Sequence, residues 1–393
     1  MIAVIADDFT GAAEIGGVGL RYGLKSVILT SADSADREHG AELLILATNS
    51  RSLSGEEALK ETERVTRLVV GMEPELIFKK IDSVLRGNIT REITAHLPIG
   101  GKKRAIMVPA NPGLGRTIEK GIYYVNGIPL NRTYFAQSHE FRVDSASVVD
   151  LVGNAGIPVV SRSIGEKLPD QGIIIADVSS EADLEKWARK MDEHTLAAGG
   201  AGFFDVILAE RFGKPVMPDR QLVGLHGSAL FILGSRYPKD EKMLATIKGD
   251  SLVRKNMPAE IYRDRHHDPS LLGRWAEEII LALGRGERVV VSADHKMHRE
   301  RNLSKRIRAT LGLLVKLVSD RVKLDNLIIE GGATTYEILN NLDIRKLSPQ
   351  EELDFGIILM KAENHPGLNI ITKPGSYPWP DHVEFSHTRA SAR

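Results

Sequence analysis

Hydrophobic and polar positions define two kinds of segment along the chain. Short apolar runs rich in β-branched residues are typical of buried strands, and longer stretches with apolar positions three and four apart are typical of amphipathic helices. Helices are expected at residues 55–70 and 181–194. Strands are expected at residues 2–6, 26–30, 43–48, 76–81, 105–109 and 172–178. This alternation predicts a parallel sheet with helices on its faces.

The alternation stops near residues 213–227, where glycine and proline are frequent. It resumes with expected strands at residues 229–234, 288–292, 326–330 and 368–372. A chain of 393 residues also exceeds one ordinary hydrophobic core. We therefore predict an α/β protein of two domains, residues 1–225 and 226–393. Each domain is expected to be a largely parallel sheet flanked by helices, with the active site in the cleft between the domains.

Composition limits the classes of partner. The 52 Lys and Arg residues balance 52 Asp and Glu residues, so no broad basic field for nucleic acid is expected. The absence of cysteine excludes disulfides and thiolate metal sites. Neither a signal-peptide pattern nor an apolar run of about 20 residues is found. A cytoplasmic protein without membrane partners is expected, and a homo-oligomer is left open.

Two charged groups follow the first strands. Asp7 and Asp8 come directly after residues 2–6, and Arg51 follows residues 43–48. Ligands of open α/β sheets bind at the carboxyl ends of strands, so these side chains are expected where a substrate binds. An arginine there can hold a carboxylate through two parallel hydrogen bonds. The alternative is that one of the two aspartates caps a helix, the other is solvated, and Arg51 is a surface charge.

The most informative segment is residues 79–88, which reads Lys-Lys-Ile-Asp-Ser-Val-Leu-Arg-Gly-Asn. A polyhydroxylated anion needs such a mixture of cations for its charge and of Asp and Ser for its hydroxyls. An acid beside the attacked hydroxyl would also serve as general base in phosphoryl transfer. The candidate contacts in this segment are Lys80, Asp82, Ser83 and Arg86.

A fourth strand end leads into the loop of residues 109–117. Two prolines and two glycines fix a tight turn there, which presents backbone amides and Arg116. Arg116 is therefore a further candidate substrate contact, although the loop can equally be structural.

Small-residue turns follow three strands of the second half: Gly234-Ser235, residues 331–335 and residues 373–376. In such turns backbone amides and a helix N-terminus can surround phosphate oxygens. None of them matches the P-loop or dinucleotide-binding patterns. Histidines at 266–267, 295 and 298 lack a third ligand at a telling spacing, so no metal site is predicted.

Several of these segments resemble motifs of the four-carbon acid sugar kinases, which phosphorylate compounds such as threonate, erythronate and 3-oxo-tetronate. Asp7-Asp8-Phe9-Thr10-Gly11-Ala12 resembles the family's opening DD-[LF]-TGA motif. Residues 80–88 resemble K-x-DSTLRGN, with Val84 in place of threonine, and residues 109–116 are similar to P-A-x-P-x-x-GR. The similarity covers nearly the whole chain, with its motifs in the family's order.

The resemblance implies an acid-sugar-binding N-terminal domain and a C-terminal domain that binds ATP with Mg²⁺. Two segments depart from the family pattern: GGDT is Gly-Gly-Ala-Thr at 331–334, and KPGGFG is Lys-Pro-Gly-Ser-Tyr-Pro at 373–378. The implied substrate contacts are Asp8, Arg51, Asp82, Ser83 and Arg86, and the implied nucleotide contacts are Ser235, Gly331, Gly332, Ala333, Thr334 and Gly375.

We therefore predict an ATP-dependent kinase that phosphorylates a hydroxyl of a small acid sugar. Asp8 or Asp82 would accept the hydroxyl proton, while Lys80 and Arg86 would offset negative charge. One alternative is a sugar-acid-binding protein without catalysis, which the altered segments at 331–334 and 373–378 favour. Another is an isomerase or aldolase that uses Lys79, Lys80 and Asp82 without nucleotide.

Overall fold

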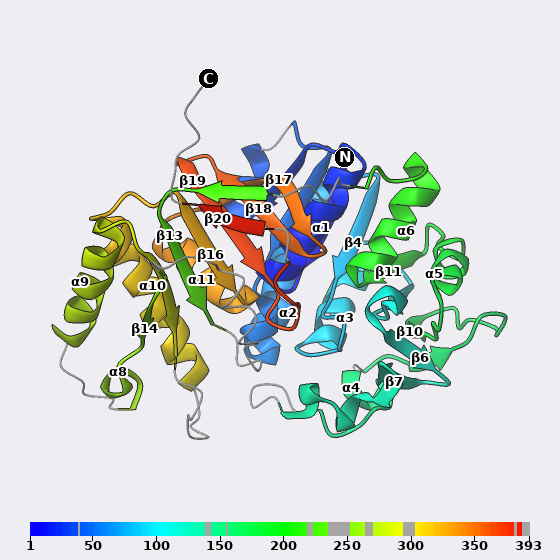
Figure 1. The fold of residues 1–393 in the computed structure, drawn as a ribbon. Helices are drawn as coiled ribbons and strands as arrows, with labels where there is room; N and C mark the ends of the chain where they lie inside the picture. The colour runs from blue at the N-terminus through cyan, green and yellow to red at the C-terminus, as the bar shows by residue number, and fades with distance from the viewer. Residues whose placement is uncertain are drawn as a thin grey trace. The chain divides into compact units, whose positions relative to one another are not determined.

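The structure is a computed structural model that describes residues 1–37, 40–137, 143–154, 156–217, 223–234, 252–263, 270–293, 303–380 and 383–386. It divides into two compact units, Met1–Met217 and Pro218–Arg393. Figure 1 draws the first unit from blue to green and the second from green to red. Each unit has a mostly parallel sheet with helices, as predicted. In the described ranges, no helix is both long and apolar enough to cross a membrane.

The first unit is built on an eight-stranded parallel sheet in the order β2-β3-β1-β4-β11-β5-β10-β9. Its central strands are continuous apolar runs because both faces are covered. A small antiparallel sheet, β6-β7-β8, is formed by the segment between β5 and β9. The strands are β1 (Ile2–Ala6), β2 (Ser26–Leu29), β3 (Leu43–Ala47), β4 (Leu76–Lys80), β5 (Arg104–Val108), β6 (Arg116–Glu119), β7 (Ile122–Val125), β8 (Ile128–Pro129), β9 (Val159–Arg162), β10 (Gly172–Ala176) and β11 (Thr195–Gly199).

Helices cover both faces of this sheet. Helix α1 packs against α6, and α2 packs against α3. Lys79 and Lys80 are successive strand residues and so point to opposite faces; their side chains reach α3 and α1, which places the two helix pairs on opposite faces. The helices are α1 (Phe9–Arg21), α2 (Gly55–Gly71), α3 (Ile89–Ile99), α4 (Val148–Val152), α5 (Glu181–Ala188) and α6 (Ala201–Phe212).

The second unit has its own sheet in the order β14-β15-β13-β16-β19-β18-β17. Five strands are parallel, and β18 runs antiparallel to both β17 and β19. Strands β12 (Val223–His226) and β20 (Val383–Ser386) form a separate parallel pair. The other elements are β13 (Ala229–Leu233), β14 (Leu252–Asn256), α8 (Ala259–Arg263), α9 (Ser270–Gly284), β15 (Arg288–Ser292), α10 (Leu303–Ser319), β16 (Asn326–Glu330), α11 (Gly332–Asn341), β17 (Lys346–Asp354), β18 (Ile357–Ala362) and β19 (His365–Lys373).

One predicted helix is too long. The pattern at residues 181–194 predicts a helix to His194, but α5 ends at Ala188. The amides of Lys190 and Met191 bond carbonyls only three residues back, and Asp192 Oδ1 then accepts hydrogen bonds from the amide of His194 and the hydroxyl of Thr195. An aspartate that binds nearby backbone in this way competes with the helix, which explains the early end.

Candidate active site

Three loops of the first unit converge because their strands are neighbours in the sheet. In the register of β1, β3 and β4, Ala6 is paired with both Ala47 and Lys80. The following residues therefore leave the sheet at the same edge. Thr48 Oγ1 donates a hydrogen bond of 2.9 Å to the carbonyl of Ala6, and the Arg51 amide donates one of 3.1 Å to the carbonyl of Asp7.

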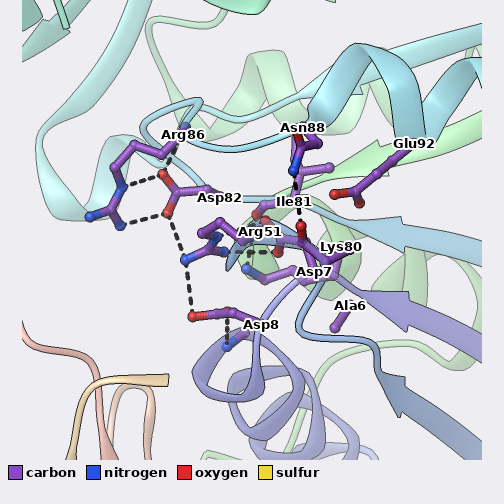
Figure 2. Close-up of polar contacts among 12 residues, drawn as sticks. Ala6, Asp7, Asp8, Arg51, Lys80, Ile81, Asp82, Arg86, Asn88 and Glu92 are labelled. Atoms are coloured by element: carbon purple, nitrogen blue, oxygen red, sulfur yellow. Dashed lines mark hydrogen bonds and ion pairs between the residues drawn. The ribbon is translucent and has the colours of Figure 1, made fainter. Parts of the chain in front are cut away.

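Arg51 lies between three carboxylates. Its Nε and one terminal nitrogen donate hydrogen bonds of 2.8 Å to both oxygens of Asp7. Its other terminal nitrogen lies 2.9 Å from Asp8 Oδ2 and 3.4 Å from Asp82 Oδ1 (Figure 2). The predicted fork is thus present, but it holds carboxylates of the chain itself. We call Asp7, Asp8, Arg51, Asp82 and Arg86 the strand-end cluster.

Asp8 also begins helix α1. Its Oδ1 accepts a 2.8 Å hydrogen bond from the Gly11 amide, and its Oδ2 accepts one of 2.8 Å from Thr10 Oγ1. A Cβ at Gly11 would lie 2.8 Å from Asp8 Oδ1 and 3.1 Å from Lys80 Nζ, so only glycine permits this approach. The helix-cap interpretation of Asp8 and the active-site interpretation therefore describe the same side chain.

Asp82 and Arg86 form the other half of the cluster. Arg86 donates two side-chain hydrogen bonds of 2.7 and 2.8 Å to the Asp82 carboxylate, and its amide donates a third of 3.0 Å. The loop between them is strained, since Leu85 has φ of +63° although its side chain is buried. At Gly87, where φ is +98°, a Cβ would lie 2.8 Å from Arg51 Cγ. This glycine allows the loop to pass close to Arg51.

The arginines keep the buried aspartates ionised. Burial alone would raise the pKa of Asp8, but Arg51 and Lys80, together with hydrogen bonds from Thr10 and Gly11, outweigh it and lower that pKa. Burial opposes ionisation of Asp82 as well, and Arg86 and Arg51 hold its pKa far below the usual range. The cluster therefore presents ionised carboxylates that accept hydrogen bonds at neutral pH.

The remaining predicted substrate contacts lie near the cluster. Lys80 Nζ is 3.3 Å from Glu14 Oε2 and donates to the carbonyl of Ile81 at 3.1 Å. Arg116 donates a hydrogen bond to Ser83 Oγ. The structure thus connects Ser83 with the loop of residues 109–117, as their shared position at strand ends suggests.

Phe135 and Tyr123 are missing from the sequence-based prediction. The guanidinium carbons of Arg86 and Arg116 lie 5.9 and 5.6 Å from the centre of the Phe135 ring, within cation–π range. The hydroxyl of Tyr123 donates to the carbonyl of Ser83. No local signal identifies Phe135, because it lies in a short 3-10 helix, Tyr134–Gln137, far from Arg86 in sequence.

The glycine turn of the second unit leads from β16 into α11. Gly331 has φ of +100° and caps the helix that begins at Gly332, which is buried. A Cβ at Gly234, which follows β13, would lie 2.2 Å from Thr334 Oγ1, so the two turns touch. Ala333 follows in the first turn of α11. These residues present a helix N-terminus and close backbone, the arrangement that binds phosphate in many proteins.

The segment of residues 373–378 lies beside this turn. The Gly331 amide donates a 3.0 Å hydrogen bond to the carbonyl of Lys373. The buried Lys373 ammonium lies 3.3 Å from Glu330 Oε2 and donates to the carbonyls of Pro374 and Tyr377 at 3.0 and 2.7 Å. Burial lowers the pKa of Lys373 despite Glu330. The lysine thus closes the loop that contains the predicted contact Gly375.

Ser235 and the histidines at 266–267, 295 and 298 lie outside the described residues. In the part of the chain that is described, no group of three or more His, Asp and Glu side chains is arranged to hold a metal ion. That the chain has no metal site of its own therefore stays a prediction.

The first α/β unit has a polar, charged site at its strand ends, and the second has glycine-rich turns at its strand ends. Residues 2–207 match the model of a sugar-binding N-terminal domain, and residues 230–377 match that of a nucleotide-binding C-terminal domain. With these two domains in this order, the chain belongs to the four-carbon acid sugar kinase family.

Some curated relatives match most of the chain and others about half of it. A D-threonate kinase of Salmonella typhimurium is 26% identical over 95% of this chain and 94% of its own length. A D-erythronate kinase of Heliobacterium modesticaldum is 30% identical over 47% of this chain and 46% of its own length. A crystal structure of a protein from Salmonella typhimurium LT2 covers 97% of both chains with a TM-score of 0.76. Its sequence identity of 17% shows a shared fold alone.

Proposed function

We propose that this protein is an ATP-dependent kinase that phosphorylates a hydroxyl of a four-carbon acid sugar such as threonate, erythronate or 3-oxo-tetronate. The observation that carries the proposal is the strand-end cluster, which lies in the domain matched by the sugar-binding model. The kinases among its relatives act on acids of this class by name. Ionised carboxylates accept hydrogen bonds from sugar hydroxyls, and nearby arginines donate hydrogen bonds to the carboxylate of an acid.

The acid group is assigned to the arginines around Phe135. Arg86 and Arg116 approach one aromatic ring, which brings two guanidinium groups into the same region. Planar guanidinium donors match a carboxylate better than a lysine ammonium does. All three side-chain nitrogens of Arg51 donate to Asp7 or Asp8, whereas two of the three of Arg86 donate to Asp82, so we propose that Arg51 acts on the substrate through Asp8 and Asp82. Ser83, held by Arg116, would bind a substrate hydroxyl.

Asp8 is the proposed acceptor of the hydroxyl proton. Asp82 accepts two hydrogen bonds from the Arg86 guanidinium and one from its amide, whereas Asp8 accepts one from the Arg51 guanidinium and two from the neutral groups of Thr10 and Gly11. A carboxylate with a lowered pKa is a weak base, but phosphoryl transfer through a loose transition state depends mainly on positioning and charge. Asp8 would therefore orient the hydroxyl first and accept its proton late.

The nucleotide is assigned to the second unit. Gly331, Gly332, Ala333 and Thr334 would surround its phosphates, together with Gly375 and Ser235. Mg²⁺ would arrive with ATP, since this ion is held largely by substrate phosphates in kinases and supplies charge neutralisation there. The phosphoryl group would pass from the nucleotide of this unit to the acid bound by the first. We also propose a cytoplasmic location; a homo-oligomer stays a prediction.

The test combines titration calorimetry with a coupled ATPase assay over a panel of four-carbon sugar acids. Binding of ATP with Mg²⁺ and acid-dependent ADP release with at least one acid are expected. Binding of an acid without ATP binding would instead support a non-catalytic protein, which the alanine at 333 and the proline at 378 favour. Binding of neither ligand would refute the proposal.

The nucleotide-independent aldolase alternative is disfavoured by geometry. A Schiff-base mechanism needs an accessible amine. The ammonium of Lys79 is fully buried against Glu92, and that of Lys80 lies between Glu14 and a backbone carbonyl.

A further inference from the structure

Strand β4 is tied to helices on both faces by buried ion pairs. Lys80 reaches Glu14 of α1, and on the other face Lys79 Nζ lies 2.6 Å from Glu92 Oε2 of α3. The Lys79 and Glu92 side chains are 0% and 1% exposed. The proposed reaction uses neither of these two residues.

Lys79 connects the segments that lead into the strand-end cluster. Its ammonium donates hydrogen bonds of 3.4 Å to the carbonyl of Ile5 and 3.3 Å to that of Lys80. Ile5 lies two residues before Asp7, and Lys80 two residues before Asp82. Glu92 belongs to the first turn of α3, directly after the loop that carries Arg86 (Figure 2). One ammonium group thus joins both strand ends and the helix that closes the loop.

The buried ion pair of Lys79 and Glu92 is not explained by a contribution to stability alone. Removing two charges from water costs several kcal/mol per ion, and apolar pairs of similar volume are often equal or better. The contact is an ion pair without good hydrogen-bond alignment, because neither Glu92 oxygen has a hydrogen-bond partner of suitable geometry among the described residues. Nearby His96 adds no compensating charge: burial, with Lys79 and Lys102, lowers its pKa to about 3.

We propose that Lys79 is a positioning residue for phosphoryl transfer, which acts with Glu92 by fixing the ends of β1 and β4 and the start of α3. This inference rests on the proposed function. A misplacement of about 1 Å in a reacting group can cost about 100-fold in rate. The pair would hold Asp8 and Asp82 at the separation that the substrate requires, without touching substrate itself.

The test compares single and double apolar replacements. Lys79→Met or Glu92→Met alone leaves a buried charge without its partner and is expected to lower the melting temperature strongly. The double variant Lys79→Met/Glu92→Met removes both charges and is expected to melt close to wild type. Its kcat should nevertheless fall at least tenfold, while the KM for ATP stays within twofold.

A matched control uses the pair of Arg21 and Asp205, which joins α1 to α6 at the other end of α1. Arg21→Met/Asp205→Met should keep wild-type kcat. A Lys79/Glu92 double variant with wild-type kcat and acid affinity would overturn the inference and leave the pair a structural contact. The proposed function is tested by the activity and acid binding of the wild-type protein alone. This inference is tested by the ratio of the kcat of the double variant to that of wild type. If wild type binds the acid without turnover, the dissociation constant of the acid replaces kcat in that ratio.

Discussion

Arg51→Met removes the cation that three buried carboxylates share. Arg51 bonds both oxygens of Asp7, one oxygen of Asp8, and lies 3.4 Å from Asp82. Removing one partner of a buried ion pair typically destabilises a protein by about 3–5 kcal/mol. We expect a loss of that size at pH 7, because Asp7 loses the donor to both of its oxygens and Asp8 loses its arginine, while Arg86 still neutralises Asp82.

The sign of the pH dependence distinguishes this cause from lost packing. In wild type the pKa of Asp8 and of Asp82 is lower when folded than the usual 3.8, so their contribution to stability is present above about pH 4 and is lost as the pH falls through the folded pKa. Burial is the largest single influence on the pKa of Asp8, so without Arg51 we expect it to outweigh Lys80, Thr10 and Gly11 and to raise that pKa above 3.8. The variant should then gain stability as the pH falls from 7 towards 4.5, and its deficit relative to wild type should shrink.

Urea denaturation at pH 7 and pH 4.5, followed by tryptophan fluorescence, measures both effects. Arg64→Met is the control, because Arg64 also meets two acids, Asp33 and Glu61, but is about half exposed. Exposed pairs contribute up to about 1 kcal/mol, so this control should change little. The reasoning fails if Arg51→Met costs no more than Arg64→Met, or if its deficit is the same at both pH values.

Three further predictions concern activity. Asp8→Asn should lower kcat at least about 100-fold in the coupled assay, since an amide cannot accept the hydroxyl proton; near-normal kcat would leave Asp8 a helix cap. Arg86→Lys should raise the KM for the acid about tenfold, or about 1.4 kcal/mol, because a planar fork becomes a point charge; an unchanged KM would place Arg86 outside the site. Gly332→Val should abolish ATP binding in calorimetry but leave acid binding measurable, because a side chain would block the backbone; surviving ATP affinity would reduce the turn to a structural role.

The strands of the fold were predictable where they are buried on both faces. Residues 2–6, 288–292 and 326–330 are strands with the predicted limits, because parallel strands that are covered on both faces are continuous apolar runs. The turn at Asn126-Gly127 has a local cause, because an Asn-Gly pair tolerates the positive φ that both residues adopt. Strand β17 was missed: its sequence is largely polar and contains Pro349, so it lacks both the apolar run and the alternation.

Pairing within the candidate site was less predictable than its location. Strand ends identified Asp8, Arg51, Asp82 and Arg86, and the structure brings all four together. The sequence suggested that Arg51 faces a substrate carboxylate, whereas it binds Asp7, which is 44 positions away. Such a pairing depends on which strands are neighbours and on the course of each loop. Local sequence determines neither.

Aspartates in a site for anionic substrates need an explanation, because they would repel both the acid group and the phosphates. Carboxylates accept hydrogen bonds from sugar hydroxyls, and Arg51 lies where it offsets the charge of three of them at once. Acidic and cationic side chains are balanced in and around the strand-end cluster: Asp7, Asp8, Asp82 and Glu14 against Arg51, Lys80, Arg86 and Arg116. On the proposed function, the aspartates would therefore accept hydrogen bonds from hydroxyls at particular positions of the sugar. The arginines at Phe135 would favour binding of an acid over a neutral sugar. Exchanging Arg86 should then weaken binding of the acid more than that of the matching neutral polyol.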